Sequence, residues 1–350
     1  MLILVFLTAF MISFAAIPSI IRIAGRLHLY DEPNDRKRHG EKTPLLGGVA
    51  VFASMLFAFT LAAARYFEPA NIFIITALIL LFFFGLRDDI APLAPLKKLS
   101  GQVLAAMIVI LFSDIRLTSL HGLFGIHSLP YAFSIFISLI VILFIVNAYN
   151  LIDGIDGLAS GLAVISSLAF AGLFFVYGDM LMAILAVSLG GALLGFLPHN
   201  FYKARIFLGD TGTMTIGFVL AFFSLHFISL ARTNPVEGWF DYTSAPVIVF
   251  AILVIPMIDA LRVFTIRIFK WRSPFIGDRN HIHHRLLETG LKPPLVSILL
   301  YIINSLFILS SWVLREFDAT FVLLGMISTA LLITQLPVIW LRFKKQRQIS

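Results

Sequence analysis

The sequence predicts an all-α integral membrane protein that crosses the bilayer about eleven times. Of its 350 residues, 59% are hydrophobic and only 13% are charged. Apolar runs of about 20 residues follow one another along the chain, which is the length a helix needs to span a membrane. No long polar segment remains to form a separate soluble domain, so residues 1–350 are expected to form a single membrane-embedded domain. The absence of cysteine excludes disulfides and thiolate metal sites.

The order of apolar and basic segments also predicts how the chain is oriented. Spans are expected near 2–22, 45–65, 70–86, 99–115, 131–149, 158–177, 180–197, 212–231, 245–266, 295–314 and 319–341. Of the 26 Lys and Arg residues, 22 lie in alternate connections and the C-terminal tail. Because basic residues favour the cytoplasmic side, segments 22–44, 87–98, 149–157, 198–211 and 262–294 are expected there. The N-terminus is then outside and the C-terminus cytoplasmic.

The first of these segments carries a basic run followed by a glycine pair at the start of a span. Anionic lipid headgroups are enough to explain Arg36, Lys37 and Arg38. They do not explain Gly47 and Gly48, which predict a backbone packed closely against a ligand or another helix.

The second segment begins with Asp88 and Asp89 at the end of a span. Adjacent carboxylates repel each other unless a cation lies near them. That cation could be a hard metal ion such as Mg²⁺, which binds carboxylate and phosphate oxygens. It could equally be the side chain of Arg87 or Lys98, in an ordinary salt bridge.

The third segment places Asn150, Asp153 and Asp156 between two spans. If this stretch is helical, the three side chains share one face. Acids at the rim of a membrane usually face a polar cavity, so they are candidates for function. The alternative is a helix-capping turn built from Asn, Asp and Gly.

The fourth segment contains Asn200, Phe207 and the sequence Gly209-Asp210-Thr211-Gly212-Thr213 just before a span. An acid beside exposed backbone N–H groups at a helix start predicts an anion site at which Asp210 could hold a metal. The alternative is an N-cap formed by Asp210 or Thr211. An aromatic ring in this polar loop would provide a stacking surface for a base.

The fifth segment carries Arg279, His281, His283, His284 and Arg285. These side chains could donate to a pyrophosphate. Three histidines could instead bind a transition metal, or the segment could be a solvated basic loop. Phosphate donors are favoured because the other polar motifs are rich in Asp and Asn. The last two spans and the basic tail are expected to be scaffold and anchor.

Together the five segments collect acids for a divalent metal and basic groups for phosphates on one membrane face. These are the components of phosphoryl transfer. A site at that position suits one lipid substrate and one soluble substrate.

The motifs resemble those of the polyprenyl-phosphate N-acetylhexosamine-1-phosphate transferases, the WecA/MraY superfamily. They occur in the family's order between residues 31 and 285: Asp31-x-Pro-x-x-Arg36-x-x-His39 with Thr43-Pro44-x-x-Gly47-Gly48, Gly85-x-x-Asp88-Asp89 with Lys98, Asn150-Leu-x-Asp153-Gly-x-Asp156-Gly157, Asn200 with Phe207-x-Gly209-Asp210-Thr211-Gly212, and His281-Ile-His283-His284-Arg285. The last motif resembles the WecA-like branch. The MraY branch would show three consecutive histidines after Pro-Leu, so UDP-GlcNAc is expected as donor rather than UDP-MurNAc-pentapeptide.

This resemblance implies transfer of N-acetylglucosamine-1-phosphate from UDP-GlcNAc to undecaprenyl phosphate, with release of UMP. The reaction would initiate a cell-surface glycan, such as lipopolysaccharide or teichoic acid, at the cytoplasmic face of the bacterial inner membrane. The implied cofactor is Mg²⁺, with Mn²⁺ as the alternative metal. Membrane lipids are expected as partners and nucleic acid is not, and a homodimer is left open.

The resemblance also implies a role for each motif residue. Asp210 and Asn150 would bind the metal, Phe207 would stack on uracil, and Asp153 and Asn200 would line the nucleotide pocket. Asp156 and Lys98 would help hold that site, and Lys98 is preferred to Lys97 from its spacing to Gln102. The donor phosphates or sugar would be held by Arg279, His281, His283, His284 and Arg285.

Asp88 and Asp89 would contact the lipid phosphate, either as a base or through the metal. A phosphate monoester has a second pKa of about 6, so much of the acceptor is already ionised at neutral pH. That property favours positioning over a base.

Two alternatives remain. Within the enzyme class, another UDP-amino-sugar could be the donor. In a different class, a transporter or flippase for polyprenyl-linked sugars would also be multi-spanning and basic inside, but it should carry ionisable residues at mid-membrane on several broken spans. A metalloprotease is disfavoured because the sequence contains no His-Glu-x-x-His stretch.

Overall fold

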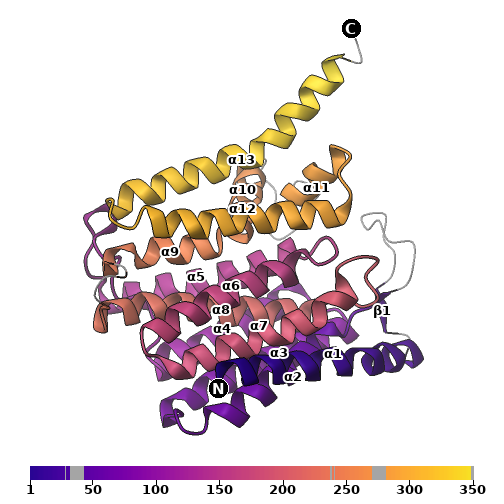
Figure 1. The fold of residues 1–350 in the computed structure, drawn as a ribbon, viewed down its shortest axis with the longest axis horizontal. Helices are drawn as coiled ribbons and strands as arrows, with labels where there is room; N and C mark the ends of the chain where they lie inside the picture. The colour runs from indigo at the N-terminus through magenta and orange to yellow at the C-terminus, as the bar shows by residue number, and fades with distance from the viewer. Residues whose placement is uncertain (28, 32–42, 237–238, 240, 270–280, 348–350) are drawn as a thin grey trace.

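The computed structural model is almost entirely helical and describes every residue except 28, 32–42, 237–238, 240, 270–280 and 348–350 (Figure 1). The helices are α1 (Leu2–Arg26), α2 (Gly47–Ala63), α3 (Ile72–Ile90), α4 (Pro95–Phe112), α5 (Tyr131–Ile152), α6 (Leu158–Val176), α7 (Met180–Asn200), α8 (Gly209–Thr233), α9 (Ala245–Ile252), α10 (Val254–Phe269), α11 (Ile282–Glu288), α12 (Pro293–Val313) and α13 (Ala319–Arg347). Three-residue 3₁₀ helices lie at Pro69–Asn71, Leu123–Gly125 and Tyr242–Ser244.

The prediction of a polytopic helical membrane protein is confirmed, but the count of eleven spans is not. Within the described residues, nine helices are long and apolar enough to cross a membrane. A tenth span results if the bent pair α9 and α10 counts as one. The remaining expected span, α2, is an apolar helix of 17 residues and falls short of the usual length. The orientation in the membrane stays a prediction.

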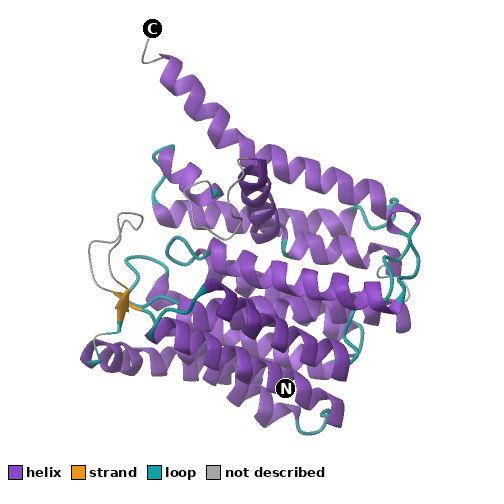
Figure 2. Cartoon of the chain, turned by 180° about the vertical axis from the view of Figure 1, so that it is seen from behind, coloured by secondary structure: helices purple, strands orange, loops and turns teal. Residues whose placement is uncertain are grey.

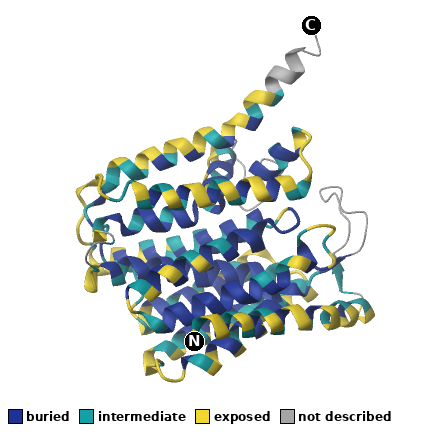
Figure 3. Ribbon diagram, viewed as in Figure 1, coloured by how far each residue is buried: buried dark blue, intermediate teal, exposed yellow. Residues whose placement is uncertain are grey.

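Two helices form the centre of the bundle. In α7 and α8, 83% of the residues in the most apolar window are buried, against 22% in α1 and 28% in α13. Helices α1, α2 and α6 pack on α7, while α3 and α5 pack on α8. Buried residues are concentrated in this middle layer, and the outer helices expose apolar side chains (Figure 3). Such exposed apolar faces are expected where a helix contacts lipid.

The break between α9 and α10 turns the chain by 73°. Asn304, buried on α12, donates to the carbonyl of Ile252 at 3.1 Å, and Ser166 of α6 donates to the same oxygen at 3.1 Å. A carbonyl freed from a helical ladder inside a membrane needs such partners. The bend is therefore stabilised by polar side chains from two neighbouring helices.

One departure from the all-α prediction is a short antiparallel ladder between β1 (Tyr30–Asp31) and β2 (Thr43–Pro44), drawn in Figure 2. After β2, the N–H groups of Gly47 and Gly48 donate to the carbonyls of Phe207 and Leu208 at 2.9 and 2.7 Å. A Cβ on Gly48 would lie 2.6 Å from the Cα of Gly212 in α8. The close backbone packing that these glycines predict is present, and its partner is the start of α8.

The connections between helices collect at two opposite ends of the bundle (Figure 1). One, called here the site end, contains the ends of α3, α5 and α7, the starts of α4, α6 and α8, and α11. The other, called the far end, contains residues 113–130, 177–179, 314–318 and the described part of 234–244. Each of the five predicted polar segments has described residues at the site end. The first adjoins the start of α8 through Pro44 of β2, and the fifth contributes α11.

Candidate active site

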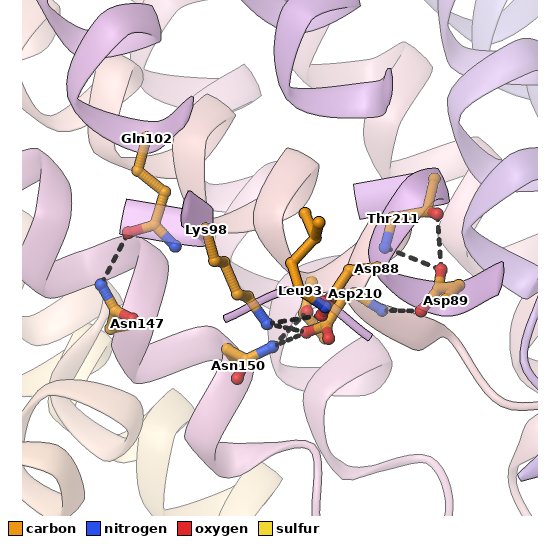
Figure 4. Close-up of polar contacts among 10 residues, drawn as sticks. Asp88, Asp89, Leu93, Lys98, Gln102, Asn147, Asn150, Asp210 and Thr211 are labelled. Carbon is orange, nitrogen blue, oxygen red and sulfur yellow. Dashed lines mark hydrogen bonds and ion pairs between the residues drawn. The ribbon is translucent and has the colours of Figure 1, made fainter. Parts of the chain in front are cut away.

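The start of α8 is capped by a carboxylate from another helix. Asp89, at the end of α3, accepts hydrogen bonds from the backbone N–H of Asp210 at 2.6 Å and of Thr211 at 3.0 Å, and from the Thr211 hydroxyl at 2.5 Å (Figure 4). The first N–H groups of a helix have no partner within it and carry partial positive charge. Both oxygens of Asp89 are thus engaged in fixing α8 against α3. The alternative, an N-cap formed by Asp210 or Thr211, is not what the structure shows, because the N-cap of α8 is Leu208 and makes no side-chain capping bond.

Lys98 lies between two carboxylates of the site. Its Nζ is 2.5 Å from Asp210 Oδ1 and 3.3 Å from Asp88 Oδ2. The other oxygen of Asp88 accepts from the backbone N–H of Leu93 at 2.6 Å, which bends the chain back toward α4. The ammonium group offsets the repulsion that two neighbouring carboxylates would otherwise exert. Lys98 reaches the acids, whereas Lys97 is exposed.

Asn150 completes the cluster from α5. Its amide nitrogen donates to Asp210 Oδ1 and, at 2.9 Å, to the hydroxyl of Thr213. One turn deeper, Asn147 donates to Gln102 at 2.9 Å, so a second polar pair joins α4 to α5 behind the cluster (Figure 4). Asn147 was missed by the sequence analysis, although an amide inside an apolar run is a visible signal.

The donor set of this cluster fits a hard divalent cation. Among the described residues, no three His, Asp or Glu side chains lie close enough to form a metal-binding group. However, Mg²⁺ usually takes only one or two carboxylates and completes its shell with water and substrate phosphate. The carboxylates of Asp88 and Asp210 and the carboxamide of Asn150 supply oxygens of that kind. Rotation of the Asn150 side-chain amide by about 180° would point its oxygen, instead of its nitrogen, at a bound cation.

The predicted helical face of Asn150, Asp153 and Asp156 is wrong. Helix α5 ends at Ile152, and the N–H of Gly154 turns back to the carbonyl of Ile152 at 2.8 Å. The chain then forms a tight turn over 153–157, called here the carboxylate loop, before α6 begins. This outcome matches the turn alternative, because Gly residues in this stretch favour a turn over continued helix.

The carboxylate loop is tied to the segment that precedes α8. Asp156 Oδ2 accepts from the N–H of Ala204 at 3.0 Å. Asn200 is buried and accepts from the N–H of Gly157 at 3.0 Å while donating to the carbonyl of Ile206 at 3.0 Å. These contacts show Asn200 and Asp156 holding backbone. Phe207 lies in the same segment, and its stacking role stays a prediction.

The histidine segment is anchored by an acid that the sequence analysis did not single out. Asp259 of α10 is buried; one of its oxygens lies 2.8 Å from His281 Nδ1, and the other accepts from the N–H of Ile282 at 2.8 Å. His281 precedes α11, whose first turn is therefore held by α10. An acid within an apolar span is an expected marker of function, so Asp259 could have been found from the sequence.

His283 connects this segment to the carboxylate loop. Its ring packs on Gly154, where an added Cβ would lie 2.7 Å from His283 Cε1, and it stacks 5.6 Å from the ring of His281. Burial, followed by the charges of His284 and His281, holds the pKa of His283 well below its usual value. The ring is therefore neutral at physiological pH, which suits packing better than charge-based phosphate binding.

The remaining predicted residues differ in what the structure shows. The ring of His284 lies 4.3 Å from that of His283 and is only partly buried. Arg285 forms an ion pair with Glu288 at 3.1 Å on the same helix. Arg279, together with the Asp31–His39 motif beyond Asp31, lies outside the described residues.

Comparison with known proteins gives one family. A model described as glycosyl transferase family 4 matches residues 71–228. This range covers α3 to α7, α8 up to residue 228, and the site residues Asp88, Asp89, Lys98, Asn150 and Asp210. A decaprenyl-phosphate N-acetylglucosaminephosphotransferase of Mycobacterium tuberculosis (strain H37Rv) is 34% identical, over 96% of this chain and 89% of its own length. An undecaprenyl-phosphate alpha-N-acetylglucosaminyl 1-phosphate transferase of Escherichia coli (strain K12) is 30% identical, over 77% of this chain and 72% of its own length.

Proposed function

The chain belongs to glycosyl transferase family 4, the WecA/MraY superfamily, and we propose that it transfers N-acetylglucosamine-1-phosphate from UDP-GlcNAc to a polyprenyl phosphate. An oxygen of the acceptor phosphate attacks the sugar-bearing phosphorus of the donor. The bond between the two donor phosphates breaks, and UMP leaves. The product is a lipid-linked sugar pyrophosphate, the starting unit of a cell-surface glycan.

The names of the relatives support this choice of substrates. Both named relatives are N-acetylglucosamine phosphate transferases, and both act on polyprenyl phosphates. They differ in the length of the lipid, which is decaprenyl in one and undecaprenyl in the other. We propose undecaprenyl phosphate as acceptor. A site that contacts the phosphate end would tolerate either chain.

We also propose that the site end faces the cytoplasm of a bacterial inner membrane. This orientation follows from the 22 of 26 basic residues that the predicted topology places on that side. A cytoplasmic site would receive the soluble UDP-sugar from one direction and the lipid phosphate from the membrane.

The observation that carries the proposal is the cluster of Asp88, Lys98, Asn150 and Asp210 at the start of α8. Four helices contribute to it, and Asn150 donates to Asp210. The positive charge of Lys98 lies between two negative charges, within 3.3 Å of the carboxylates of both Asp88 and Asp210. Lys98 supplies a positive charge that can pair with a phosphate oxygen once substrate is bound. A fixed array of this kind positions two phosphates and stabilises the charge that develops between them.

The residues at the start of α8 also divide into those that contact substrate and those that hold the contacting residues in place. The acceptor phosphate is largely ionised at neutral pH, so its attack does not require a general base. Asp89 uses both oxygens on the start of α8, and we propose that it positions Asp210 instead of removing a proton. Asp88 and Lys98 are then the groups placed to meet the acceptor phosphate.

We propose that Asp210 and Asn150 hold Mg²⁺, with Mn²⁺ as the alternative metal. Bound there, the ion would supply positive charge to the pyrophosphate of the donor. Lys98, which lies against Asp210 in the structure, would then pair with substrate phosphate. Asp89 would keep Asp210 in place throughout.

The nucleotide half of the donor is assigned to the neighbouring loops. We propose that Phe207 stacks on uracil and that Asp153 contacts the nucleoside. Asn200 and Asp156 would hold these loops through the backbone contacts described above. The donor phosphates or the sugar would be met by Arg279, His281, His284 and Arg285, with His283 packing behind them.

A donor and acceptor panel tests the proposal. Purified protein in detergent is incubated with Mg²⁺, undecaprenyl or decaprenyl phosphate, and radiolabelled UDP-GlcNAc, UDP-GalNAc or UDP-MurNAc-pentapeptide. The expected result is a lipid-linked product from UDP-GlcNAc with stoichiometric release of UMP. Omission of Mg²⁺ should remove it.

Product from a different UDP-sugar alone would overturn the choice of donor and keep the reaction. No product from any donor, in folded protein with the expected melting transition, would overturn the enzyme assignment. A transporter of polyprenyl-linked sugars would then be the function to test by vesicle flux.

A further inference from the structure

Helix α12 contacts the carboxylate loop through two side chains that lie one turn apart. The hydroxyl of Ser297 donates to the carbonyl of Asp156 at 3.0 Å, and the hydroxyl of Tyr301 donates to the carbonyl of Gly157. Two successive backbone carbonyls of the loop are thus held by one helix. The sequence alone predicts a scaffold role for this helix, whereas the structure places it beside the loop.

The same two residues are also held by the segment that follows α7 and by Asn200 at its end. The N–H of Gly157 donates to Asn200, and the side chain of Asp156 accepts from Ala204. Gly157 has a φ of +75°, and a Cβ there would lie 2.7 Å from the ring of Phe201. The loop therefore has little freedom to shift without losing contacts on one side or the other.

The ring of Tyr301 is fitted to its position by the first turns of α6. A Cβ on Gly161 would lie 2.7 Å from Tyr301 Cε1, so only glycine leaves room for the ring. Ser297 is fully buried, and Tyr301 is partly buried. Hydroxyl groups in such surroundings make directed hydrogen bonds that water does not replace.

Helix α12 also follows directly after the histidine segment. Only residues 289–292 separate it from α11, whose His283 packs on Gly154 of the carboxylate loop. The helix is thereby linked to both groups: to the histidines by a short connection and to the loop by hydrogen bonds. It fixes the distance between them.

We propose that Ser297 and Tyr301, together called the α12 clamp, are positioning residues for the nucleotide sugar. They hold the loop that carries Asp153 in register with the histidine segment, so that one donor molecule meets both. This inference rests on the proposed function. The cluster of Asp88, Lys98, Asn150 and Asp210 is held separately, by α3, α4, α5 and α8. The clamp therefore acts on donor binding and leaves the reacting phosphates in place.

Kinetics of Tyr301→Phe and Ser297→Ala test the clamp. Each change removes one hydroxyl and keeps the shape of the side chain, so folding should persist. We expect each to raise the KM for the UDP-sugar by about tenfold, the effect of one buried hydrogen bond. The kcat and the KM for the lipid should stay within about twofold of wild type. Titration calorimetry with UDP should show the same weakening without turnover.

The far end offers a matched control for each variant. Tyr177→Phe also removes a buried tyrosine hydroxyl, one without a hydrogen-bond partner among the described residues. Ser244→Ala also removes a serine hydroxyl that donates to a carbonyl, that of Arg315 at 3.2 Å. Neither control should change the KM for the UDP-sugar or the affinity for UDP.

The clamp and the proposed function fail in different ways. If wild type turns over UDP-sugar and both clamp variants keep its KM and its affinity for UDP, the clamp is overturned. A fall in kcat at unchanged KM would also overturn it, since that result would place these residues at the reacting phosphates. If wild type makes no product from any donor, the proposed function is what fails.

Discussion

The aspartates at the two ends of the bundle use their carboxylates differently. At the far end, Asp318 and Asp241 accept from backbone N–H groups two residues ahead, at 2.9 and 3.2 Å, and so cap the short stretch in which they lie. At the site end, Asp89 accepts from residues 121 and 122 positions away, and Asp210 accepts from a residue 60 positions away. The first pattern stabilises one helix end. The second fixes several helices relative to one another.

This contrast separates what an acid does for folding from what it does for function. Removing a local cap destabilises only the helix end that it caps, because no other group depends on the position of that carboxylate. An acid shared between helices sets the geometry of the groups around it, as Asp89 does for Asp210. Substitutions at the two ends should therefore differ in kind, and the following experiments are ordered from the largest expected effect to the smallest.

Replacing Asp210 should have the largest effect. Asp210→Asn keeps the shape of the side chain but removes the charge that faces Lys98. We expect kcat to fall by about 100- to 1000-fold, comparable to the loss of a preorganised electrostatic contact elsewhere. Product formation by purified protein measures this, with Asp318→Asn as the control at the far end. Activity within a few-fold of wild type would place the reaction outside this cluster.

Replacing Asp89 should reduce both activity and stability. Asp89→Ala leaves the N–H groups of Asp210 and Thr211 without their acceptor, which should cost about 1–3 kcal/mol. The start of α8 would also shift, and misplacement of Asp210 by about 1 Å is expected to lower the rate about 100-fold. Thermal unfolding in detergent and initial rates are measured on the same preparation. A loss of rate with an unchanged melting temperature would contradict the capping role.

Replacing Asp259 should weaken the histidine segment. Asp259→Asn keeps an acceptor for Ile282 but removes the charge beside His281. We expect a loss of about tenfold in kcat/KM for the UDP-sugar, the size of one hydrogen bond to a charged group. Nearly unchanged kcat/KM for the lipid would serve as the internal control. Equal losses for both substrates would argue for a general structural effect instead.

The pair of Asp179 and His226 is the long-range exception at the far end, with 2.7 Å between Asp179 Oδ2 and His226 Nε2. Burial raises the pKa of Asp179, but the hydrogen bond and the charge of His226 outweigh burial and lower it. We expect Asp179→Asn to lower stability by about 1.5 kcal/mol at neutral pH without changing activity. A double-mutant cycle with His226→Ala isolates the coupling between the two side chains.

The pH dependence of that pair follows from the direction of the shift. A carboxyl group whose pKa is lower in the folded state adds stability above its unfolded pKa of about 3.9. That contribution disappears as the pH falls through the folded value. The gap in melting temperature between wild type and Asp179→Asn should therefore be present above that pH and close below about pH 4. A gap that persists in acid would assign the effect to packing.

The smallest effect is expected from a purely local cap. Asp318→Ala removes an acceptor for the N–H groups of Thr320 and Phe321 at the start of α13. The loss of such a cap costs about 1 kcal/mol, and activity should not change. Circular dichroism melts and initial rates test this together. A clear loss of activity would mean that the far end is coupled to the site.

The sequence determined the class of the protein and the candidate residues of its site. Hydropathy is additive along the chain, so each of the eleven predicted ranges overlaps a described helix. The bend between α9 and α10 and the 17-residue α2 reduce the helices that qualify as spans to nine or ten. The motifs around Asp88, Asn150, Asp210 and His281 are short stretches of consecutive residues. They can be recognised in the sequence without knowing which residues they contact in the fold. They were enough to identify the family.

Only the tertiary structure decided how those motifs are used. It made Asp89 the cap of α8, ended α5 before Asp153, and brought Asp259 to His281 and Tyr301 to Gly157. The physical reason is that a hydrogen bond is directional and short, so its partner depends on which helices pack side by side. Neighbouring residues in sequence cannot specify a contact that spans more than a hundred positions.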